Sequence, residues 1–159
     1  MAKLVKLCFI RRSFFEIHSD YIKILDVGSP QKQSQRTHLC VVIEKDDNNF
    51  FIPLRNNLGD AVRKYGRIGH SVPSETRKRA GLDYRYALIV NDREYVEDAA
   101  ERRIPKRQLK QIENDYDEIC REFTVYLNGY KKAAKKGKVD KIPLFRESSL
   151  VNFHSELNL

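Results

Sequence analysis

Two short apolar runs on either side of a polar tetrapeptide give the clearest structural signal in the sequence. The runs are Leu39 to Ile43 and Phe50 to Leu54, and Asp46-Asp47-Asn48-Asn49 separates them. Short polar side chains bond to nearby backbone and tolerate positive φ, so the tetrapeptide favours a turn. Apolar residues occupy both alternating sets of positions in each run. The pattern predicts a β-hairpin at the centre of a sheet, with neither face in contact with water.

Both outer ends of this hairpin turn abruptly polar. Antiparallel pairing brings the outer ends of two strands together. The side chains there that can donate hydrogen bonds belong to Arg36, Thr37, His38, Arg55, Asn56 and Asn57. The sequence therefore predicts a cluster of donors at the mouth of the hairpin, fixed on a rigid scaffold.

The chain before the hairpin carries weaker signals. Leu4 to Ile10 and Phe14 to Ile17 are β-prone runs, and the first is predicted to be an added strand or an arm. Ser19 suits the N-cap of a short helix that holds Tyr21 to Leu25. The polar segment Ser29 to Gln35 lacks periodicity and is predicted to be a mobile loop that leads into the hairpin.

After the hairpin, the pattern alternates between a basic irregular segment and short apolar runs. Leu58 to Arg79 is rich in cations, and its glycines and proline predict a mostly irregular flap. Leu82 to Val90 is predicted to be a strand whose first half is polar and aromatic and whose second half is apolar. Glu94 to Ala100 is predicted to form a short helix or a turn.

The last third of the sequence has the pattern of one long helix. Pro105 suits the first helical position, and the helix is expected to end near Gly137. Apolar residues at spacings of three and four place one face against the sheet; they are Leu109, Ile112, Tyr116, Ile119, Phe123, Leu127 and Tyr130. The apolar segment Ile142 to Phe153 is expected to dock back onto the domain.

Length and charge narrow the class of protein. At 159 residues the chain is long enough to fold as one domain, residues 1 to 159, around its own core. Its net charge of +8 favours a polyanionic partner. No apolar run approaches the roughly 20 residues of a membrane-spanning helix. The composition therefore favours nucleic acid over a membrane.

The cysteines and the first residues predict a reducing compartment. Cys8, Cys40 and Cys120 are widely spaced among apolar neighbours, which favours buried thiols and offers no zinc spacing. Lys6 interrupts the apolar core of the first segment and Arg11-Arg12 closes it, unlike a signal peptide. We expect the protein to stay in the cytoplasm.

Recognised motifs for nucleotide cofactors, zinc hydrolases and esterases are absent from the sequence. Its acidic residues cluster on the flank of the long helix, where a solvated face explains them better than a magnesium site. The sequence thus predicts no cofactor and no metal. RNA cleavage suits the groups that remain, because a ribonucleotide supplies its own 2′-hydroxyl nucleophile. The protein must align that group, offer a base or acid, and stabilise charge with Arg or Lys.

Three stretches then carry a resemblance to a known family. They are SFFEIHSDYIKIL (Ser13 to Leu25), RTHLCVVIEKDDNNFFIPLRNN (Arg36 to Asn57) and RAGLDYRYALIV (Arg79 to Val90), followed by the long helix and Ser149-Leu150. In this order they resemble the toxins of type III toxin–antitoxin systems, the ToxN/AbiQ family and especially its CptN/TenpN-like branches.

The resemblance implies a fold, an activity and partners. The fold would be α+β, with a compact, highly twisted antiparallel sheet or barrel core like that of MazF and Kid, and helices packed on it. The activity would be a metal-independent endoribonuclease that leaves a 2′,3′-cyclic phosphate on cellular or phage mRNA. A small pseudoknotted RNA, processed from a repeat array, would hold it inactive in a closed toxin–RNA hetero-oligomer.

The family pattern also implies catalytic candidates. Tyr21 matches a tyrosine that the family places near its active site, and Arg36 stands where relatives have lysine. After Pro53-Leu54 relatives carry Thr and Ser hydroxyls and a nearby Lys, whereas this chain has Arg55-Asn56-Asn57. Arg55 could stabilise charge and Asn56 could orient a phosphate or a base. We assign the catalytic site to Tyr21, Arg36, Thr37, His38, Arg55 and Asn56.

Concentrated cations with few acids favour phosphate binding. The candidate RNA-binding residues are Asn57, Lys64, Arg77, Lys78, Arg79, Arg85, Arg102, Arg103, Lys106, Lys131, Lys132, Lys135 and Lys136.

Each central candidate also has a structural explanation. His38 titrates in the useful range, yet a histidine beside a strand is often a core or turn residue. Tyr21 could instead pack its helix, and Asp83 and Arg85 could form a structural ion pair. An active site around Lys78, Asp83 and Arg85 is the alternative to the hairpin mouth. Two alternative functions also remain: a non-catalytic RNA-binding module, and a MazF-like interferase that a protein antitoxin restrains.

Overall fold

The computed structural model describes residues 5–26, 28–33, 39–59, 68–99 and 104–159. Within these residues seven strands form one antiparallel sheet in the order β4-β5-β3-β2-β1-β7, and β6 pairs with β3 beside β5. The strands are β1 (Leu7–Ile10), β2 (Cys40–Lys45), β3 (Asn48–Arg55), β4 (Gly69–Ser71), β5 (Gly81–Asp83), β6 (Leu88–Ile89) and β7 (Val96–Asp98).

The predicted hairpin is confirmed as β2 and β3, with a shorter turn than the sequence indicated. Asp46 and Asp47 both have positive φ, 52° and 65°. Positive φ at both central residues is typical of the two-residue turns whose twist matches that of the flanking strands. Asn48 and Asn49 therefore belong to β3, where they pair with Lys45 and Glu44.

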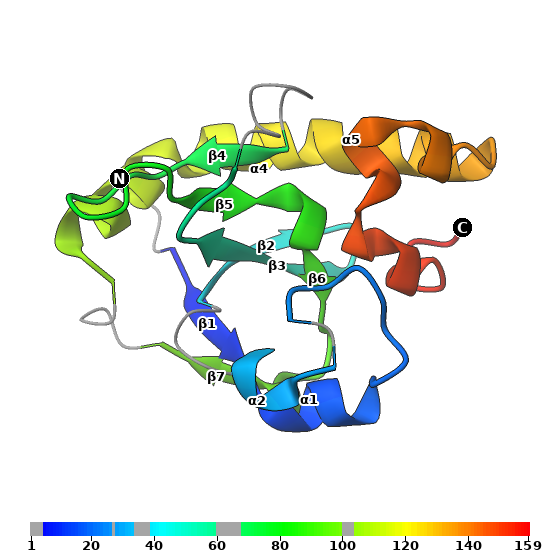
Figure 1. Cartoon of the computed structure of the whole chain (residues 1–159), viewed down its shortest axis with the longest axis horizontal. Helices are drawn as coiled ribbons and strands as arrows, with labels where there is room; N and C mark the ends of the chain where they lie inside the picture. The colour runs from blue at the N-terminus through cyan, green and yellow to red at the C-terminus, as the bar shows by residue number, and fades with distance from the viewer. Residues whose placement is uncertain (1–4, 27, 34–38, 60–67, 100–103) are drawn as a thin grey trace.

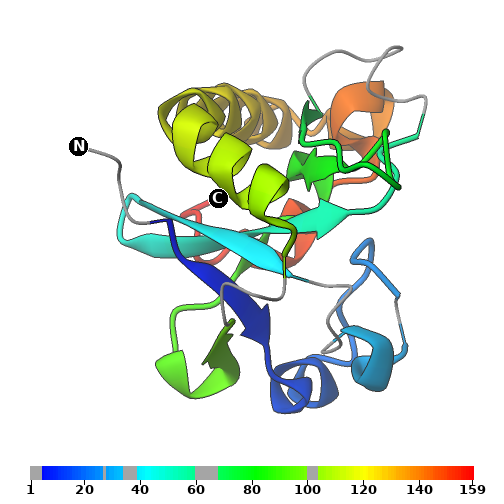
Figure 2. The ribbon, with the colours of Figure 1, turned by 90° about the vertical axis from the view of Figure 1, so that its left-hand side faces the viewer.

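Helices cover the two faces of the sheet (Figure 1 and Figure 2). The long helix α4 (Lys106–Lys135) lies on one face, where Phe123 meets Phe50 of β3 with ring centroids 5.0 Å apart. The short helices α1 (Arg12–Ile17) and α2 (Pro30–Gln33) lie on the other, where Phe15 lines a small apolar cavity together with Pro53 of β3. The central hairpin is buried on both faces, as predicted.

The N-terminal segment differs from the expectation. Leu7–Ile10 forms a strand as predicted, but Phe14 to Ile17 is helical, because α1 buries the adjacent rings of Phe14 and Phe15 together. The predicted loop at Ser29 to Gln35 holds α2, and residues 34–38 lie outside the described part of the chain.

The helix predicted at Tyr21 to Leu25 does not form. Lys23 and Asp26 adopt positive φ, 57° and 51°, which no α-helix tolerates. The Asn152 side chain accepts a hydrogen bond from the Ile22 backbone N–H at 3.0 Å and donates one to the Ile22 carbonyl at 2.6 Å. A contact 130 residues away in sequence thus replaces the local hydrogen bonds of a helix.

The predicted strand at Leu82 to Val90 is divided in two. β5 and β6 are separated by the 3₁₀ turn η2 (Tyr84–Tyr86), and both pair with the same edge of β3. The Asp83 carboxylate accepts a hydrogen bond from the Arg85 backbone N–H at 3.1 Å, which starts the turn. Downstream, the predicted helix or turn at Glu94 to Ala100 is the 3₁₀ turn η3 (Arg93–Tyr95) followed by β7.

The long helix is confirmed. It begins at Lys106, directly after Pro105, and buries Ile112, Ile119, Phe123, Leu127 and Tyr130 as the periodicity predicted. At its end the Gly137 N–H bonds the Ala134 carbonyl and the Lys138 N–H bonds the Ala133 carbonyl, a Schellman motif with Gly137 at φ +64°.

The C-terminal segment docks back as expected. After the 3₁₀ turn η5 (Val139–Lys141) it forms α5 (Pro143–Arg146) and the 3₁₀ turn η6 (Ser149–Phe153). Phe145, Leu150 and Phe153 are buried, and the Phe145 ring meets Tyr126 and Tyr130 of α4. Cys8 and Cys40 are buried free thiols and Cys120 is half-buried. No helix in the described ranges is long and apolar enough to cross a membrane.

Gly81 allows β4 to approach β5 closely, and its replacement should loosen this edge of the sheet. A Cβ at Gly81 would meet the backbone carbonyl oxygen of His70. We expect Gly81→Ala to lower the free energy of unfolding by about 2–3 kcal/mol, measured by urea denaturation. Gly137→Ala is the control, because a Cβ there meets nothing and only its positive φ costs about 1 kcal/mol. Equal losses in the two variants would contradict the close approach.

Candidate functional site

The ends of β3 and β5 bring one acid and one arginine together. Arg55 is the last residue of β3, and it pairs with Gly81 of β5 in the register that sets Leu54 opposite Leu82. Arg55 Nη1 donates to Asp83 Oδ2 at 3.1 Å. The Asp83 side chain is completely buried, so its negative charge depends on such donors.

A second arginine completes the coordination of Asp83. Arg85 Nε donates to Oδ1 at 3.1 Å and Arg85 Nη2 donates to Oδ2 at 2.8 Å, a bidentate pair. Burial lowers the pKa of Arg85, but the hydrogen bonds and charge of Asp83 outweigh it and raise that pKa, so the guanidinium stays charged. The predicted Asp83–Arg85 ion pair is thus confirmed, with Arg55 as an additional member.

Tyr86 lies against both guanidinium groups. The Arg55 and Arg85 Cζ atoms stand 5.1 Å and 5.3 Å from the centre of its ring, within the range of cation–π attraction. Two positive charges share one buried negative charge, so the cluster of Arg55, Asp83 and Arg85 carries a surplus of one positive charge. The Arg55 side chain is 31% exposed against 12% for Arg85. The surplus is therefore presented to solvent through Arg55.

Arg55 opens onto a groove of about 170 Å³, which we call the Arg55 groove. Its apolar wall comes from Leu39, Leu54 and Ile104. The polar side chains that line it belong to Arg55, Asn56, Ser74, Thr76, Arg77 and Gln108. Among the described residues that line this groove none carries a carboxylate, so it offers donors and positive charge to an anion.

The loop between β4 and β5 is held in place by its own hydrogen bonds. The Ser74 hydroxyl accepts from the Arg77 N–H at 3.0 Å, and the Ser74 N–H donates to the Arg77 carbonyl at 3.1 Å. The Val72 N–H bonds the Ala80 carbonyl at 2.9 Å, which closes the base of the loop. This closed loop fixes Ser74, Thr76 and Arg77 at the wall of the groove.

The hairpin mouth is described on one side only. Arg36, Thr37, His38, Lys64, Arg102 and Arg103 lie outside the described residues. On the other side, Arg55 and Asn56 both line the groove. Asn57 is exposed, and its side-chain oxygen Oδ1 accepts a hydrogen bond from the Gly59 backbone N–H at 2.8 Å, which leaves the side-chain NH₂ group as the donor to solvent.

Tyr21 lies in an aromatic cluster and is not among the residues that line the Arg55 groove. Its ring stacks on His18 with centroids 4.5 Å apart and meets Phe153 edge-on at 5.2 Å. Burial, with smaller contributions from Glu156 and Asp20, raises the pKa of Tyr21 to about 12. The hydroxyl is therefore protonated at neutral pH and suits a proton donor better than a base.

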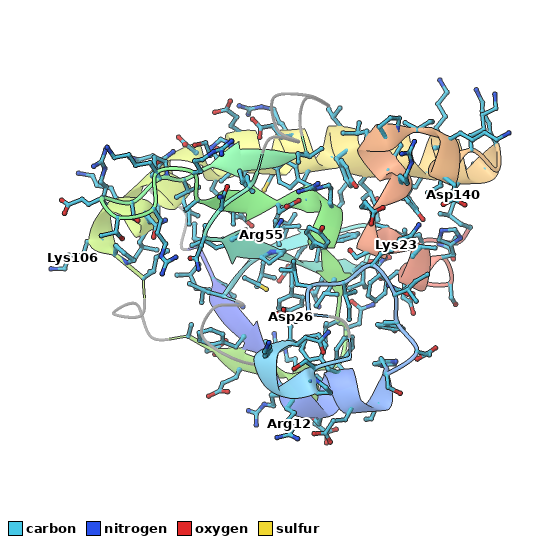
Figure 3. All side chains as sticks on the ribbon, viewed as in Figure 1. Arg12, Lys23, Asp26, Arg55, Lys106 and Asp140 are labelled. Carbon is cyan, nitrogen blue, oxygen red and sulfur yellow. The ribbon has the colours of Figure 1, made fainter. Side chains whose placement is uncertain are left out.

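The predicted basic residues within the described ranges lie at both ends of α4 and beside the groove. Arg77, Lys78 and Arg79 are exposed on the loop before β5. Lys106 is exposed at the start of α4 (Figure 3), next to Pro105 and Gln108 of the groove wall. Lys131, Lys132, Lys135 and Lys136 lie at the opposite end of the same helix. A helix of 30 residues is about 45 Å long. The two ends cannot bind the same phosphate.

The lysines at the end of α4 differ in their surroundings. Lys131 is half-buried and pairs with Asp46 in the hairpin turn at 3.7 Å. Lys132, Lys135 and Lys136 are exposed. Their charge also suits the negative end of the helix dipole, worth about 0.3–1 kcal/mol each.

Two groups of polar residues were missed by the sequence reasoning. Ser74 and Thr76 join the groove because of the loop closure, which no local pattern indicates. His70 of β4 lies between Asp115 and Glu122 of α4, and residues 45 and 52 positions apart give no spacing motif. The close packing of Gly81 against β4 positions His70 as well as the loop that carries Ser74 and Thr76.

Comparisons with known proteins give matches in structure but not in sequence. No protein-family model matches the sequence, and no curated protein matches it. Among solved structures, AbiQ, a lactococcal anti-phage endoribonuclease of a type III toxin–antitoxin system, aligns with a TM-score of 0.62 at 15% identity over 98% of both chains. The fold is that of type III toxins.

A second solved structure supports the same assignment. It comes from a bacterial type III toxin–antitoxin system whose toxin is selectively inhibited by a non-coding RNA pseudoknot. It aligns with a TM-score of 0.56 at 13% identity over 79% of both chains. The predicted α+β fold, with an antiparallel sheet, packed helices and one long C-terminal helix, is confirmed; the narrower CptN/TenpN-like branch stays a prediction.

Removal of the Asp83 charge should destabilise the protein strongly. In Asp83→Asn, two guanidinium groups face a neutral amide at a buried position. We expect the free energy of unfolding to fall by about 3 kcal/mol, measured in urea. Asp46→Asn makes the same chemical change in the exposed pair with Lys131 and should cost less than about 1 kcal/mol. Similar costs for the two variants would mean that Asp83 does not anchor the arginines.

Proposed function

We propose that the chain is an endoribonuclease toxin of a type III toxin–antitoxin system. The observation that carries the proposal is the Arg55 groove: a positively charged side chain, held by a buried carboxylate, at a groove lined by donors. The fold shared with an anti-phage endoribonuclease supports the same reaction class. Its substrate would be cellular or phage mRNA.

Arg55 and Arg77 would bind the non-bridging oxygens of the scissile phosphate. The RNA 2′-oxygen attacks the adjacent phosphorus, the bond from phosphorus to the 5′-oxygen breaks, and a 2′,3′-cyclic phosphate and a 5′-hydroxyl result. Negative charge rises on the non-bridging oxygens in the transition state, and donors already in place stabilise it. Asp83 and Tyr86 hold the Arg55 guanidinium, so little conformational entropy is lost when the phosphate binds.

Two proton transfers complete the reaction. One group removes the proton of the 2′-hydroxyl and another gives a proton to the leaving 5′-oxygen. His38 is the candidate base, because an unperturbed imidazole exchanges its proton near neutral pH. The Tyr21 hydroxyl, with its raised pKa, is suited only to the donor role. We retain Arg36, Thr37 and Asn56 as groups that orient the phosphate and the 2′-hydroxyl. No step in this scheme needs a metal ion.

The charge distribution supports an RNA inhibitor. Phosphate-binding groups stand at the two ends of α4, about 45 Å apart, and a folded RNA can span that length. A pseudoknot bound at one end of one toxin could reach the groove of the next, which would produce a closed toxin–RNA hetero-oligomer. The free thiols suit the cytoplasm, where such an RNA is made.

The alternatives predict different observations. A non-catalytic RNA-binding module would bind RNA and give no product ends. A MazF-like interferase would be inhibited by a protein. Short tandem repeats before a terminator in the DNA directly upstream of the gene would favour the RNA antitoxin over the protein.

Cleavage should not depend on a divalent cation. We expect the purified chain to cut single-stranded RNA in the presence of EDTA and to leave 2′,3′-cyclic phosphate ends, detected by their resistance to ligation until the cyclic phosphate is opened. The physical reason is that the arginines supply the positive charge that a metal ion would otherwise provide. Loss of cleavage in EDTA with recovery in magnesium would refute the proposed mechanism.

Arg55→Ala should abolish cleavage while the fold persists. Asp83 keeps its bidentate bond to Arg85, so the buried charge stays paired. Loss of one donor to the transition state lowers the rate by about 100-fold or more, measured as single-turnover RNA cleavage. Arg121→Ala, which removes an exposed arginine of α4 outside the groove lining, is the control and should leave the rate unchanged. A fully active, stable Arg55→Ala protein would place the active site elsewhere.

Charge reversal at the end of α4 should weaken binding of the antitoxin RNA. We expect the triple change Lys132→Glu, Lys135→Glu and Lys136→Glu to reduce the slope of log affinity against log salt by about one unit per lost phosphate contact. The control triple Lys6→Glu, Lys32→Glu and Arg93→Glu changes the net charge equally at exposed positions away from α4. If both triples change the slope equally, the α4 lysines act only through net charge.

A further inference from the structure

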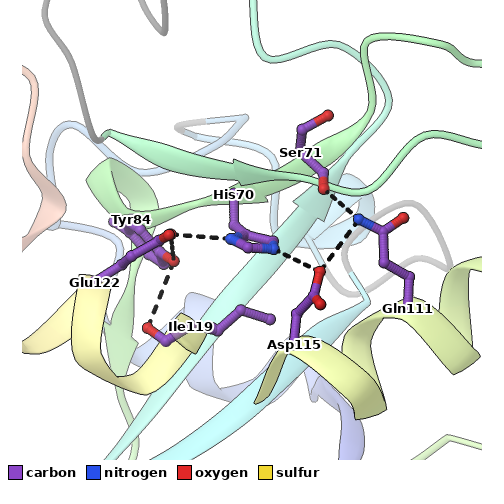
Figure 4. Close-up of polar contacts among 7 residues, drawn as sticks. All are labelled: His70, Ser71, Tyr84, Gln111, Asp115, Ile119 and Glu122. Carbon is purple, nitrogen blue, oxygen red and sulfur yellow. Dashed lines mark hydrogen bonds and ion pairs between the residues drawn. The ribbon is translucent and has the colours of Figure 1, made fainter. Parts of the chain in front are cut away.

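A cluster at the middle of α4 lies outside the arginine site (Figure 4). His70 of β4 is placed between two carboxylates of the helix. Its Nδ1 lies 3.0 Å from Glu122 Oε1, and its Nε2 lies 3.0 Å from Asp115 Oδ2. The Tyr84 hydroxyl donates to the same Glu122 oxygen at 2.8 Å. Both nitrogens of the imidazole ring are therefore positioned by named partners.

The two sides of the His70 ring differ in access. On the Nδ1 side, the Glu122 side chain is 9% exposed and Tyr84 is completely buried, so this side is closed. On the Nε2 side, Asp115 is 30% exposed and Glu118 is exposed. Only the Nε2 side can receive a group from solvent.

Three potential ligand atoms converge on that open side. One atom from each of His70, Asp115 and Glu118 lies within 4.8 Å of the others. Ligand atoms around a tetrahedral ion bound at about 2.1 Å lie about 3.4 Å apart. The pair from His70 to Asp115 is already closer than this, and Glu118 is an exposed side chain with freedom to approach. Asp115 and Glu118 are three residues apart on α4, so they share one face of the helix.

We propose that His70, Asp115 and Glu118 bind a divalent transition-metal ion such as Zn²⁺. One imidazole nitrogen with two carboxylates is a donor set that suits this class of ion, and solvent would supply the fourth ligand. Glu122 would accept the Nδ1 proton of His70. A carboxylate in this position fixes the tautomer and the ring orientation of a metal-binding histidine. Tyr84 in turn holds Glu122.

The position in the sheet assigns this ion a structural role. His70 pairs with Leu82, whereas Asp83 is the next residue along β5 and points to the opposite face of the strand. His70 and Asp83 thus point to opposite faces of the strand pair, and none of His70, Asp115 and Glu118 lines the Arg55 groove. The ion would tie the edge strand β4 to the middle of α4 and would not take part in RNA cleavage.

A proton competes with the ion for Nε2. Burial lowers the pKa of His70, but its hydrogen bonds to Asp115 and Glu122 outweigh burial and raise that pKa. A metal ion bound at Nε2 displaces any proton held there. Binding is consequently measured at mildly alkaline pH.

The test uses the untagged full chain, stripped of metal with EDTA and then dialysed, with ZnCl₂ as the probe. Calorimetric titration should give one ion per chain, and the thermal midpoint should rise with zinc concentration by mass action. Glu118→Gln removes a ligand without touching the His70 hydrogen bonds, so its metal-free midpoint should match the parent. Its zinc affinity should fall at least about tenfold. Glu113→Gln, the same change elsewhere on α4, should bind as the parent does.

Two further readouts decide between this site and other zinc binding. Co²⁺ bound by nitrogen and oxygen gives no thiolate charge-transfer band, so such a band that disappears in Cys120→Ser would overturn the assignment. The ¹⁵N signal of His70 Nε2 should shift on zinc binding while that of Nδ1 keeps its protonated position. Absence of binding, or equal affinity in Glu118→Gln and Glu113→Gln, would refute the site. None of these measurements involves RNA, so they are independent of the proposed nuclease.

Discussion

The burial of both faces of β3 constrains the rest of the structure. Phe50 and Ile52 point toward α4, while Phe51 and Pro53 point to the opposite face, where Pro53 shares a cavity with Phe15 of α1, and all four are buried. A strand of this kind has no room for catalytic polar groups along its length. Polar chemistry is confined to the end where the strand leaves the core, and there exposure increases from Leu54 and Arg55 to Asn56. The Arg55 groove lies at that exit.

The buried Asp83 carboxylate connects the fold to the site. An isolated carboxylate in the core would cost several kcal/mol in lost hydration, and donors from Arg55, Arg85 and the Arg85 backbone N–H offset that cost. The backbone bond also starts the 3₁₀ turn that ends β5. One residue therefore interrupts the strand and positions a guanidinium at the groove, which accounts for a polar group in an otherwise apolar region.

The sequence correctly predicted the elements whose signals lie within short windows. Its predictions failed where contacts with residues far away in the chain determine the conformation. The hairpin and α4 were predicted correctly, because burial on both faces and a repeat of three and four residues are properties of short windows. The helix expected at Tyr21 to Leu25 was wrong because Asn152 binds the Ile22 backbone. Arg55 and Asn56 line the groove where β3 leaves the sheet, and the predicted pairing of this end with Arg36 to His38 stays a prediction because those residues lie outside the described ranges. The walls at Ser74 and Thr76, and the partners of His70, depend on how β4 packs, which no window of sequence contains.

Helix α4 connects the Arg55 groove, the His70 cluster and the exposed lysines. Its first turn borders the Arg55 groove through Gln108, its middle holds His70, and its last turns present the exposed lysines. A helix of 30 residues is about 45 Å long, so the groove at its first turn and the lysines at its last turns are widely separated. A ligand that engages both must supply its own matching length and rigidity. Under the proposed function, a folded RNA inhibitor meets that requirement, whereas a single-stranded substrate need only enter the Arg55 groove, so a difference in RNA shape would distinguish the two.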